Sequence, residues 1–167
     1  NGGAGRDRVF YSDAASGVTA NFIAPQVNTG EAAGDTYSSI EAMNGSNFND
    51  FLTSGNDDND LIGLGGNDIL IGGEGDDLLM GGVGADTFKW NSGDQGSATT
   101  PASDHIQDFS VAEDKLDLSD LLDSLGLATS GGVIESYLSL TENSGDTVLN
   151  VKDSAAGDVV QEIVLDN

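Results

Sequence analysis

Carboxylate and carboxamide side chains recur at every ninth residue between Gly45 and Lys89, and this is the most regular chemical feature of the sequence. Five nine-residue units follow one another without a gap and read GSNFNDFLT, SGNDDNDLI, GLGGNDILI, GGEGDDLLM and GGVGADTFK. Their sixth position holds Asp50, Asn59, Asp68, Asp77 and Asp86, and their eighth holds Leu52, Leu61, Leu70, Leu79 and Phe88. Hard oxygen atoms repeated in this way beside glycines are typical ligands of a divalent cation.

The spacing also predicts the elements that position these side chains. Each unit divides into a six-residue turn and a three-residue strand, and glycine at positions 1, 2 and 4 permits positive φ values and close backbone approach in the turn. Two units then make one coil of a parallel β-roll, so every second turn lies on the same side. The eighth side chain of each unit points inward, between two facing sheets.

Stacked turns of this kind need a cation. Carbonyl and carboxylate oxygens repeated at roughly 4.8 Å along a stack of strands repel one another unless a cation lies between them. Calcium suits this position because it accepts six to eight hard oxygens in flexible geometry, whereas magnesium requires a stricter octahedral arrangement. The array holds nine acidic residues and one lysine. Three Ca²⁺ ions would nearly balance that charge.

The register predicts at least three calcium sites in the array, between the turns that begin at residues 45 and 63, 54 and 72, and 63 and 81. A fourth site is possible if residues 91–94 imitate a turn opposite the turn that begins at Gly72. The candidate ligands, including those from outside the array, are Asp7, Asn47, Asp50, Asn56, Asp57, Asn59, Gly65, Asp68, Gly73, Gly75, Asp77, Gly82, Gly84, Asp86, Asp94, Asp104 and Asp108. For Asp104 and Asp108, a role in a turn or a cap is an equally good interpretation.

Composition excludes several classes of function. Twenty-nine acidic residues against five basic ones give a net charge of -24, which disfavours binding to nucleic acid or to an anionic membrane. No cysteine is present, so disulfides and thiolate metal sites are excluded. His105 is the only histidine, which excludes a multi-histidine zinc site and leaves little basis for a Ser-His-Asp triad. We predict no catalytic residues, no enzymatic activity and no membrane insertion. We also expect a monomer.

The chain divides into four predicted regions. Residues 1–44 are expected to form degenerate coils of the roll, because Gly2–Phe10 is itself a copy of the unit, which predicts that the array continues further toward the N-terminus. Counting back in nines places Met43 at an inward position. Residues 45–89 form the regular array, residues 90–103 read as a linker, and residues 104–167 as a cap.

Within the cap, the sequence predicts a strand around Leu116, a short helix beginning at Ser119 and ending at Gly126, and three antiparallel strands over residues 137–142, 147–152 and 159–165. The array also carries apolar residues at the outward positions 7 and 9. We expect the C-terminal region to cover this outer face, with a partner surface as the alternative. The outward residues are Phe51, Ile62, Ile69, Ile71, Leu78 and Met80.

The array and its continuation resemble the C-terminal region of RTX (repeats-in-toxin) proteins, and in particular the end of large RTX adhesins. The resemblance is carried by the units GGEGDDLLM and GGVGADTFK, the bridge GADTFKW, the segment DHIQDFSVAEDKLDLSDLL and the terminal QEIVLDN. It covers about residues 45–167. The segment beginning at Asp104 is similar to the type I secretion target domain of such adhesins.

This resemblance implies an all-β fold, a right-handed calcium-bound parallel β-roll capped by antiparallel strands and one short helix. It also implies secretion to the cell surface or medium without an N-terminal signal peptide, through an ABC transporter and an outer-membrane channel. Folding would then occur only outside the cell, and the module would serve adhesion, as in biofilms, together with upstream domains of the same chain. The sequence ends soon after Leu165, which leaves open whether the secretion signal is complete.

Two alternatives remain open at this stage. The same module could belong to a secreted protease or lipase, or it could be a solenoid that binds a glycan or ice. The mixed third-position column, Asn47, Asn56, Gly65, Glu74 and Val83, disfavours an ice-binding face. One departure from the repeat also matters: Asn59 and Asp57 replace Asp and Gly in the second unit. The site between that unit and the turn at Gly72 is therefore expected to be weaker or rearranged.

Overall fold

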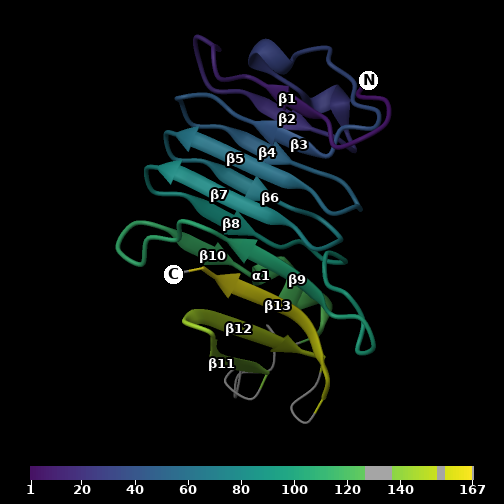
Figure 1. The fold of residues 1–167 in the computed structure, drawn as a ribbon, viewed down its shortest axis with the longest axis vertical. Helices are drawn as coiled ribbons and strands as arrows, with labels where there is room; N and C mark the ends of the chain where they lie inside the picture. Colours follow the sequence, from purple (N-terminus) through teal and green to yellow (C-terminus); the bar gives the residue numbers. More distant parts are fainter. Residues whose placement is uncertain (127–136, 154–156, 167) are drawn as a thin grey trace.

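The computed structural model shows two sheets of mainly parallel strands wound as a β-roll, which confirms the predicted fold class. It describes residues 1–126, 137–153 and 157–166. The coils stack along the long axis of the molecule, with the N-terminal strands at one end and β11 at the other (Figure 1). The first sheet has eight strands in the order β1 (Arg8–Phe10), β3 (Ala42–Asn44), β5 (Asp60–Gly65), β7 (Leu78–Val83), β9 (Ala102–Ile106), β13 (Val159–Leu165), β12 (Asp146–Lys152) and β11 (Leu138–Asn143).

The second sheet has five strands, and the chain alternates between the two sheets from β3 to β10. The strands in spatial order are β10 (Lys115–Asp117), β8 (Thr87–Lys89), β6 (Ile69–Ile71), β4 (Phe51–Thr53) and β2 (Thr19–Asn21). Two short 3-10 helices, Pro25–Val27 and Gly30–Ala32, lie in the connection between β2 and β3, and the helix α1 (Ser119–Ser124) follows β10.

The predicted register of two units per coil is confirmed in both sheets of the array. Leu61 of β5 pairs with Leu79 of β7, and Leu52 of β4 pairs with Leu70 of β6. Beyond the array, the number of residues between paired positions is larger. Leu78 of β7 pairs with His105 of β9, and Thr87 of β8 pairs with Lys115 of β10. The connections that lead into the last coil are therefore longer than the turns of the regular array.

The inward column of apolar side chains forms the core between the sheets, as the periodicity predicts. Its members at the eighth position of the array are at most 1% exposed, and Met43, at 0%, extends the column toward the N-terminus as expected. Burying such a column removes apolar surface from water at about 25 cal/mol per Å², so it is the main source of cohesion between the sheets. The column consists of Ala20, Met43, Leu52, Leu61, Leu70, Leu79, Phe88 and Ile106.

The C-terminal strands extend the roll at its end and do not fold over its outer face. The strand β13 pairs in parallel with β9 and antiparallel with β12, which in turn pairs antiparallel with β11. The expected coverage of the outer face therefore differs from the observed arrangement, in which edge pairing satisfies the backbone of β9. Among the outward side chains, Ile71 is 4% exposed and Phe51 is 37% exposed. The face is neither fully covered nor uniformly open.

The short helix lies where the sequence predicts it, but it begins differently. Its N-cap is Leu118, and no side chain caps it. The Ser119 hydroxyl instead donates to Asp117 Oδ1 over 2.6 Å, while Leu121 and Leu122 are buried. The residue after the C-cap Leu125 is Gly126, which has a φ of 74°. This is the left-handed conformation that ends many helices.

Candidate metal centre

Two columns of polar side chains run along the turns of the roll, one on each side. We call Asp50, Asp68, Asp86 and Asp114 the first turn column, and Asp7, Glu41, Asn59, Asp77 and Asp104 the second turn column. In the first, the backbone N–H groups of Asp50, Asp68 and Asp86 each donate to Oδ1 of the next member, over 2.8, 2.8 and 2.9 Å. In the second, Asn59 N–H donates to Asp77 and Asp77 N–H to Asp104, over 2.8 and 2.9 Å.

In Asp68, Asp77 and Asp86 the ladder fixes Oδ1 and leaves Oδ2 facing the first glycine of the same turn. Asp68, Asp77 and Asp86 are at most 2% exposed, and in the described part of the chain their Oδ2 atoms have no hydrogen-bond partner. Asp7 Oδ2, in the N-terminal copy of the unit, is also buried and without a partner there. A buried anionic oxygen without a donor costs several kcal/mol unless a cation or a proton neutralises it.

The electrostatics of these carboxyl groups indicate the same need. Burial raises the pKa of Asp68 to about 7 and the pKa of Asp77 to about 8. Burial also raises the pKa of Asp86, and the neighbouring charges of Asp114 and Asp108 add to that effect. Three of the five basic side chains form ion pairs outside the columns: Arg6 and Arg8 pair with Asp60, and Lys89 pairs with Asp117 and Asp120.

Backbone carbonyl oxygens of the adjacent coil lie close to the glycines of the turns. A Cβ on Gly63 would collide with Asp68 Oδ2 and with the carbonyl oxygen of Gly81, one coil further on. A Cβ on Gly82 would collide with the carbonyl oxygen of Leu64, and one on Gly84 with that of Gly66. Glycine therefore has two roles: at position 1 it admits the carboxylate, and at positions 2 and 4 it also supplies positive φ values such as 100° at Gly82.

Side chains alone do not form a cage. In residues 1–126, 137–153 and 157–166 no group of three or more His, Cys, Asp or Glu side chains is arranged to hold a metal ion. At Asp68, Asp77 and Asp86 the available donor is instead one unpartnered carboxylate oxygen each, and backbone carbonyls of the adjacent coil lie close to the same turns. Calcium accepts such a mixture of hard oxygens, so the residues present fit calcium.

Three of the acidic candidate ligands already have protein donors at both oxygens. Asp50 accepts from Ser46 N–H at Oδ2 over 2.5 Å, and from Val18 N–H and the Ser46 hydroxyl at Oδ1. Asp108 accepts from the N–H groups of Gly81 and Gly82. Asp104 accepts from Asp77 N–H at Oδ1 and from Trp90 and Gln161 at Oδ2. These contacts favour the capping interpretation of Asp104 and Asp108.

The second turn column is altered where the repeat departs from its pattern. Asn59 accepts from Gly55 N–H, and its amide donates to the carbonyl of Glu41 over 3.3 Å. The Ser54 hydroxyl, at a position otherwise held by glycine, donates to the carbonyl of Gly72 over 2.5 Å. Protein donors therefore occupy part of the space between the turns at Ser54 and Gly72. This is a physical reason for the weaker site expected there.

The remaining candidate ligands lie on the turns or on their rims. Asn56 donates to Glu74 Oε1 over 2.9 Å, and Asp94 Oδ2 accepts from Asn91 N–H within the connection from β8 to β9. Asp57 is exposed, and Asn47 Nδ2 lies 3.5 Å from the carbonyl oxygen of Ser12. The candidate glycines lie in the turns or at their edges, and they are Gly65, Gly73 and Gly75. Asp94 borders a hollow of about 270 Å³ that Asp58, Glu74 and Asp76 also line.

Two members of the turn columns, Glu41 and Asp114, were not among the candidate ligands predicted from the sequence. Glu41 precedes Asn59 by two repeat units, so counting back one coil would have found it. Asp7 N–H donates to Glu41 Oε2 over 2.9 Å. Asp114 lies beyond the irregular connection, and no simple spacing indicates its place.

A matched pair of glycines tests the crowding inside the turns. Gly82 and Gly93 have nearly equal φ values of 100° and 103°, but nothing lies within 4 Å of a Cβ on Gly93. We expect Gly93→Ala to cost about 1 kcal/mol, from backbone strain alone. Gly82→Ala should cost roughly 3 kcal/mol, because the new methyl group also displaces the Leu64 carbonyl. Chemical denaturation in saturating calcium measures both values, and equal costs would contradict the proximity of the stacked carbonyls.

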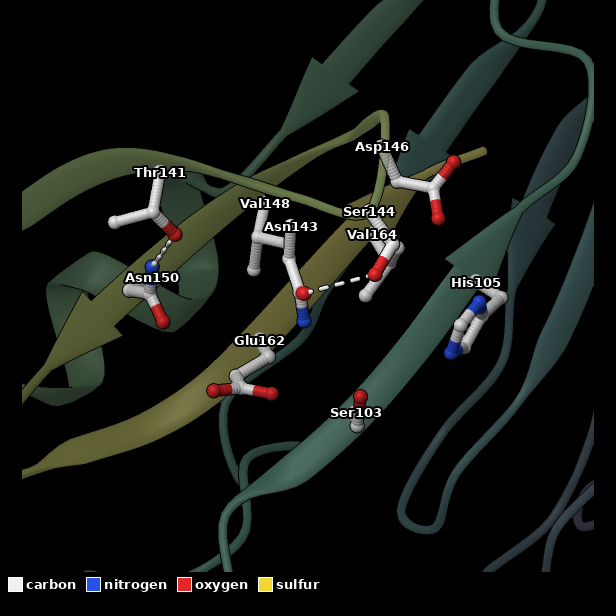
Figure 2. Close-up of a pocket in the computed structure, with 10 residues that line it drawn as sticks. All are labelled: Ser103, His105, Thr141, Asn143, Ser144, Asp146, Val148, Asn150, Glu162 and Val164. Carbon is white, nitrogen blue, oxygen red and sulfur yellow. Dashed lines mark hydrogen bonds between the residues drawn. The ribbon is translucent and has the colours of Figure 1, made fainter. Parts of the chain in front are cut away.

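A further hollow lies away from both columns, on the outer face of β9, β13, β12 and β11 (Figure 2). It has a volume of about 320 Å³, and its lining side chains, among them Glu162, Asn150 and Thr141, are mainly polar. His105 also lies there and is bonded through Nδ1 to Asp166 Oδ1 over 3.0 Å. This contact agrees with the interpretation of His105 as an ordinary strand residue.

The fold and the turn columns together define a calcium-binding β-roll of the RTX type. A family model described as "Peptidase M10 serralysin C terminal" matches residues 49–165. The chain belongs to this family of C-terminal repeat regions.

Two solved structures are similar to the chain, and both are subunits of a mannuronan C5-epimerase from Azotobacter vinelandii. The AlgE6R3 subunit is 27% identical with a TM-score of 0.47, and the match covers 72% of this chain and 71% of that one. The AlgE6R2 subunit is also 27% identical with a TM-score of 0.47, and the match covers 99% of this chain and 86% of that one. A search of curated proteins finds no match.

No helix within the described residues has the length and apolar character that crossing a membrane requires.

Proposed function

We propose that this chain is a calcium-dependent folding and secretion module at the C-terminal end of a large extracellular RTX protein, and that the protein is an adhesin. The observation that carries the calcium part is the set of buried Oδ2 atoms of Asp68, Asp77 and Asp86, which have no hydrogen-bond partner among the described residues. These oxygens are satisfied when a divalent cation binds between the turns.

The proposed ligands fall into interior and end positions. Asp68 and Asp86 each lie between two other members of the first turn column, and Asp77 lies between Asn59 and Asp104 in the second. At least three ions are proposed for residues 45–89, held by these carboxylates and by carbonyls of the turns. The contact of Asp86 with Asp114 adds a candidate position between the turn at Gly81 and residues 108–114.

In this proposal calcium neutralises the negative charge of the chain, and the fold is unstable without calcium. A net charge of -24 opposes compaction, and 24 glycines raise the entropy of the unfolded chain. Extracellular calcium modules bind with Kd values of about 10⁻⁴ to 10⁻³ M, far above resting cytosolic calcium. In this proposal the chain stays unfolded in the cytosol, passes through a type I secretion channel and folds outside the cell.

The segment from Asp104 to Leu122 supports export, because it is similar to a type I secretion target domain. In the proposed division, residues 1–44 and 45–89 form the roll, residues 90–103 connect it, and residues 104–167 act as cap and secretion region. The proposed partners are calcium, the secretion machinery and upstream domains of the same chain.

A secreted enzyme is the second candidate for the whole protein, because the description of the matching family names a peptidase. In that case a catalytic domain, for example one with an H-E-x-x-H motif, lies upstream in the full-length protein. The full-length sequence distinguishes the two hosts: such a motif supports the enzyme, and repeated extracellular domains without it support the adhesin.

A calcium titration followed by circular dichroism tests the proposed folding behaviour. We expect a chain with little β-structure in excess chelator at pH 7.5 to gain a β-sheet spectrum on adding millimolar calcium, because binding free energy is folding free energy here. Magnesium at the same concentration should produce a much smaller change. A spectrum that is already β-rich in chelator and does not respond to calcium would rule out the proposal.

A further inference from the structure

The second turn column ends at a carboxylate that differs from the members before it. Asp104 is 1% exposed, as deeply buried as Asp68 and Asp86, yet its Oδ2 atom has two donors. The indole Nε1–H of Trp90 donates to it over 2.6 Å and the amide Nε2–H of Gln161 over 2.9 Å. The same atom in Asp77, one coil earlier, has no partner among the described residues.

The two donors come from distant parts of the chain. Trp90 directly follows β8 in the second sheet, and its own N–H donates to the carbonyl of Asp117 at the end of β10. Gln161 lies in β13, which pairs in parallel with β9 and places Gln161 opposite Ala102. Both donors are buried, Trp90 at 2% and Gln161 at 0% exposed, and the amide oxygen Oε1 of Gln161 has no hydrogen-bond partner among the described residues. Three separate segments of the roll therefore meet at one carboxylate.

The first turn column ends in a comparable way at its N-terminal side. There the N–H and the hydroxyl of Ser46 donate to Asp50 over 2.5 and 2.8 Å, and Val18 N–H donates over 2.7 Å. Ser46 is fully buried and occupies the second position of its unit, which glycine holds in three of the four later units. At one end of each column, the terminal carboxylate thus accepts hydrogen bonds from protein donors at both of its oxygens.

We infer that Trp90, Asp104 and Gln161 form a metal-free terminal donor cluster, in which two neutral N–H groups take the place of a cation and close the second turn column. Because Gln161 belongs to β13, the cluster connects this strand to the roll through a side-chain contact as well as through backbone pairing. This inference rests on the proposed calcium binding, because it states where that binding stops.

Asp104→Asn is the decisive variant, with the number of bound calcium ions as the measurement. If Asp104 is a cap, the folded variant binds as many ions as the unchanged chain, although it is less stable. A loss of one ion would identify Asp104 as a ligand and overturn the inference. Equilibrium dialysis of the full chain in saturating calcium gives this number.

Two substitutions at Gln161 provide a matched comparison. Gln161→Leu removes a donor without adding a charge, so we expect the thermal midpoint in saturating calcium to fall by about 5 to 10 °C with an unchanged ion count. Gln161→Glu places a second carboxylate beside Asp104, so we expect one additional bound ion and a midpoint that excess calcium restores. A Gln161→Leu chain as stable as the unchanged one would overturn the cluster.

Trp90→Phe covers the case in which the Gln161 variants fail to fold, because it removes only the indole donor. We expect a smaller loss of thermal midpoint, measured by circular dichroism, and again the same number of ions. A chain that binds no calcium at all would refute the proposed function separately. The stability of Gln161→Leu would then still report on the cluster.

Discussion

Without calcium, the chain is expected to be more stable at pH 5 than at pH 8, and at pH 8 to lose most of its β-structure. Burial raises the pKa of Asp77 to about 8, of Asp68 to about 7 and of Asp104 to about 6, from an ordinary value of 3.8. Between pH 4 and 8 the folded chain therefore holds protons that the unfolded chain releases. Stability falls as pH rises through this window and stays low above it.

Calcium should reverse this dependence, because a cation stabilises the ionised carboxylates. Calcium affinity is expected to rise with pH over the same range, and binding should release protons. Thermal midpoints in chelator and in saturating calcium, measured from pH 4.5 to 8.5, show both slopes. The double variant Asp68→Asn with Asp77→Asn is the control, because amides do not titrate. A stability in chelator that does not change with pH would contradict the burial of ionisable oxygens.

Asp68→Asn is expected to raise the calcium concentration for half-maximal folding about tenfold or more, which corresponds to roughly 1.4 kcal/mol or above. Asp68 lies between Asp50 and Asp86, and its Oδ2 atom has no protein donor in the described residues, so the substitution removes a charged ligand from the interior of a column. Folding monitored by circular dichroism during a calcium titration gives the midpoint.

Asp50→Asn is the matched control in the same column. Both of its oxygens already have protein donors, so it should shift the calcium midpoint much less than Asp68→Asn does. Asp86 is less suitable as a control, because the structure places Asp114 beyond it and makes it an interior position as well. Equal midpoints for the Asp50 and Asp68 variants would show that the two carboxylates contribute alike.

The repeat predicts the regular part of the fold, because the residues that determine each turn and strand lie within a single nine-residue unit. A nine-residue period with glycines and one inward apolar residue leaves little choice of register, so the pairing of Leu61 with Leu79 follows from counting. Strands β11, β12 and β13 were also predicted within one residue of their observed ends, because turn-forming segments separate them.

The ends of the columns were not predicted, because they depend on contacts between distant segments. Trp90 and Gln161 lie far apart in the sequence, and no repeat or spacing links either of them to Asp104. They meet only because β13 inserts beside β9, a parallel pairing that no turn signal indicates. The position of β13, β12 and β11 at the edge of the first sheet was not predicted either, because edge pairing and face packing both bury apolar segments.

The register of two units per coil also limits how such an array changes in length. One added coil, made of two units, keeps every turn on its own side, so Asp86 would still meet Asp114 and Asp77 would still meet Asp104. A single added unit moves every later turn to the opposite side of the roll and places each column against the wrong end. Gain or loss of repeats in this chain is therefore tolerated in pairs.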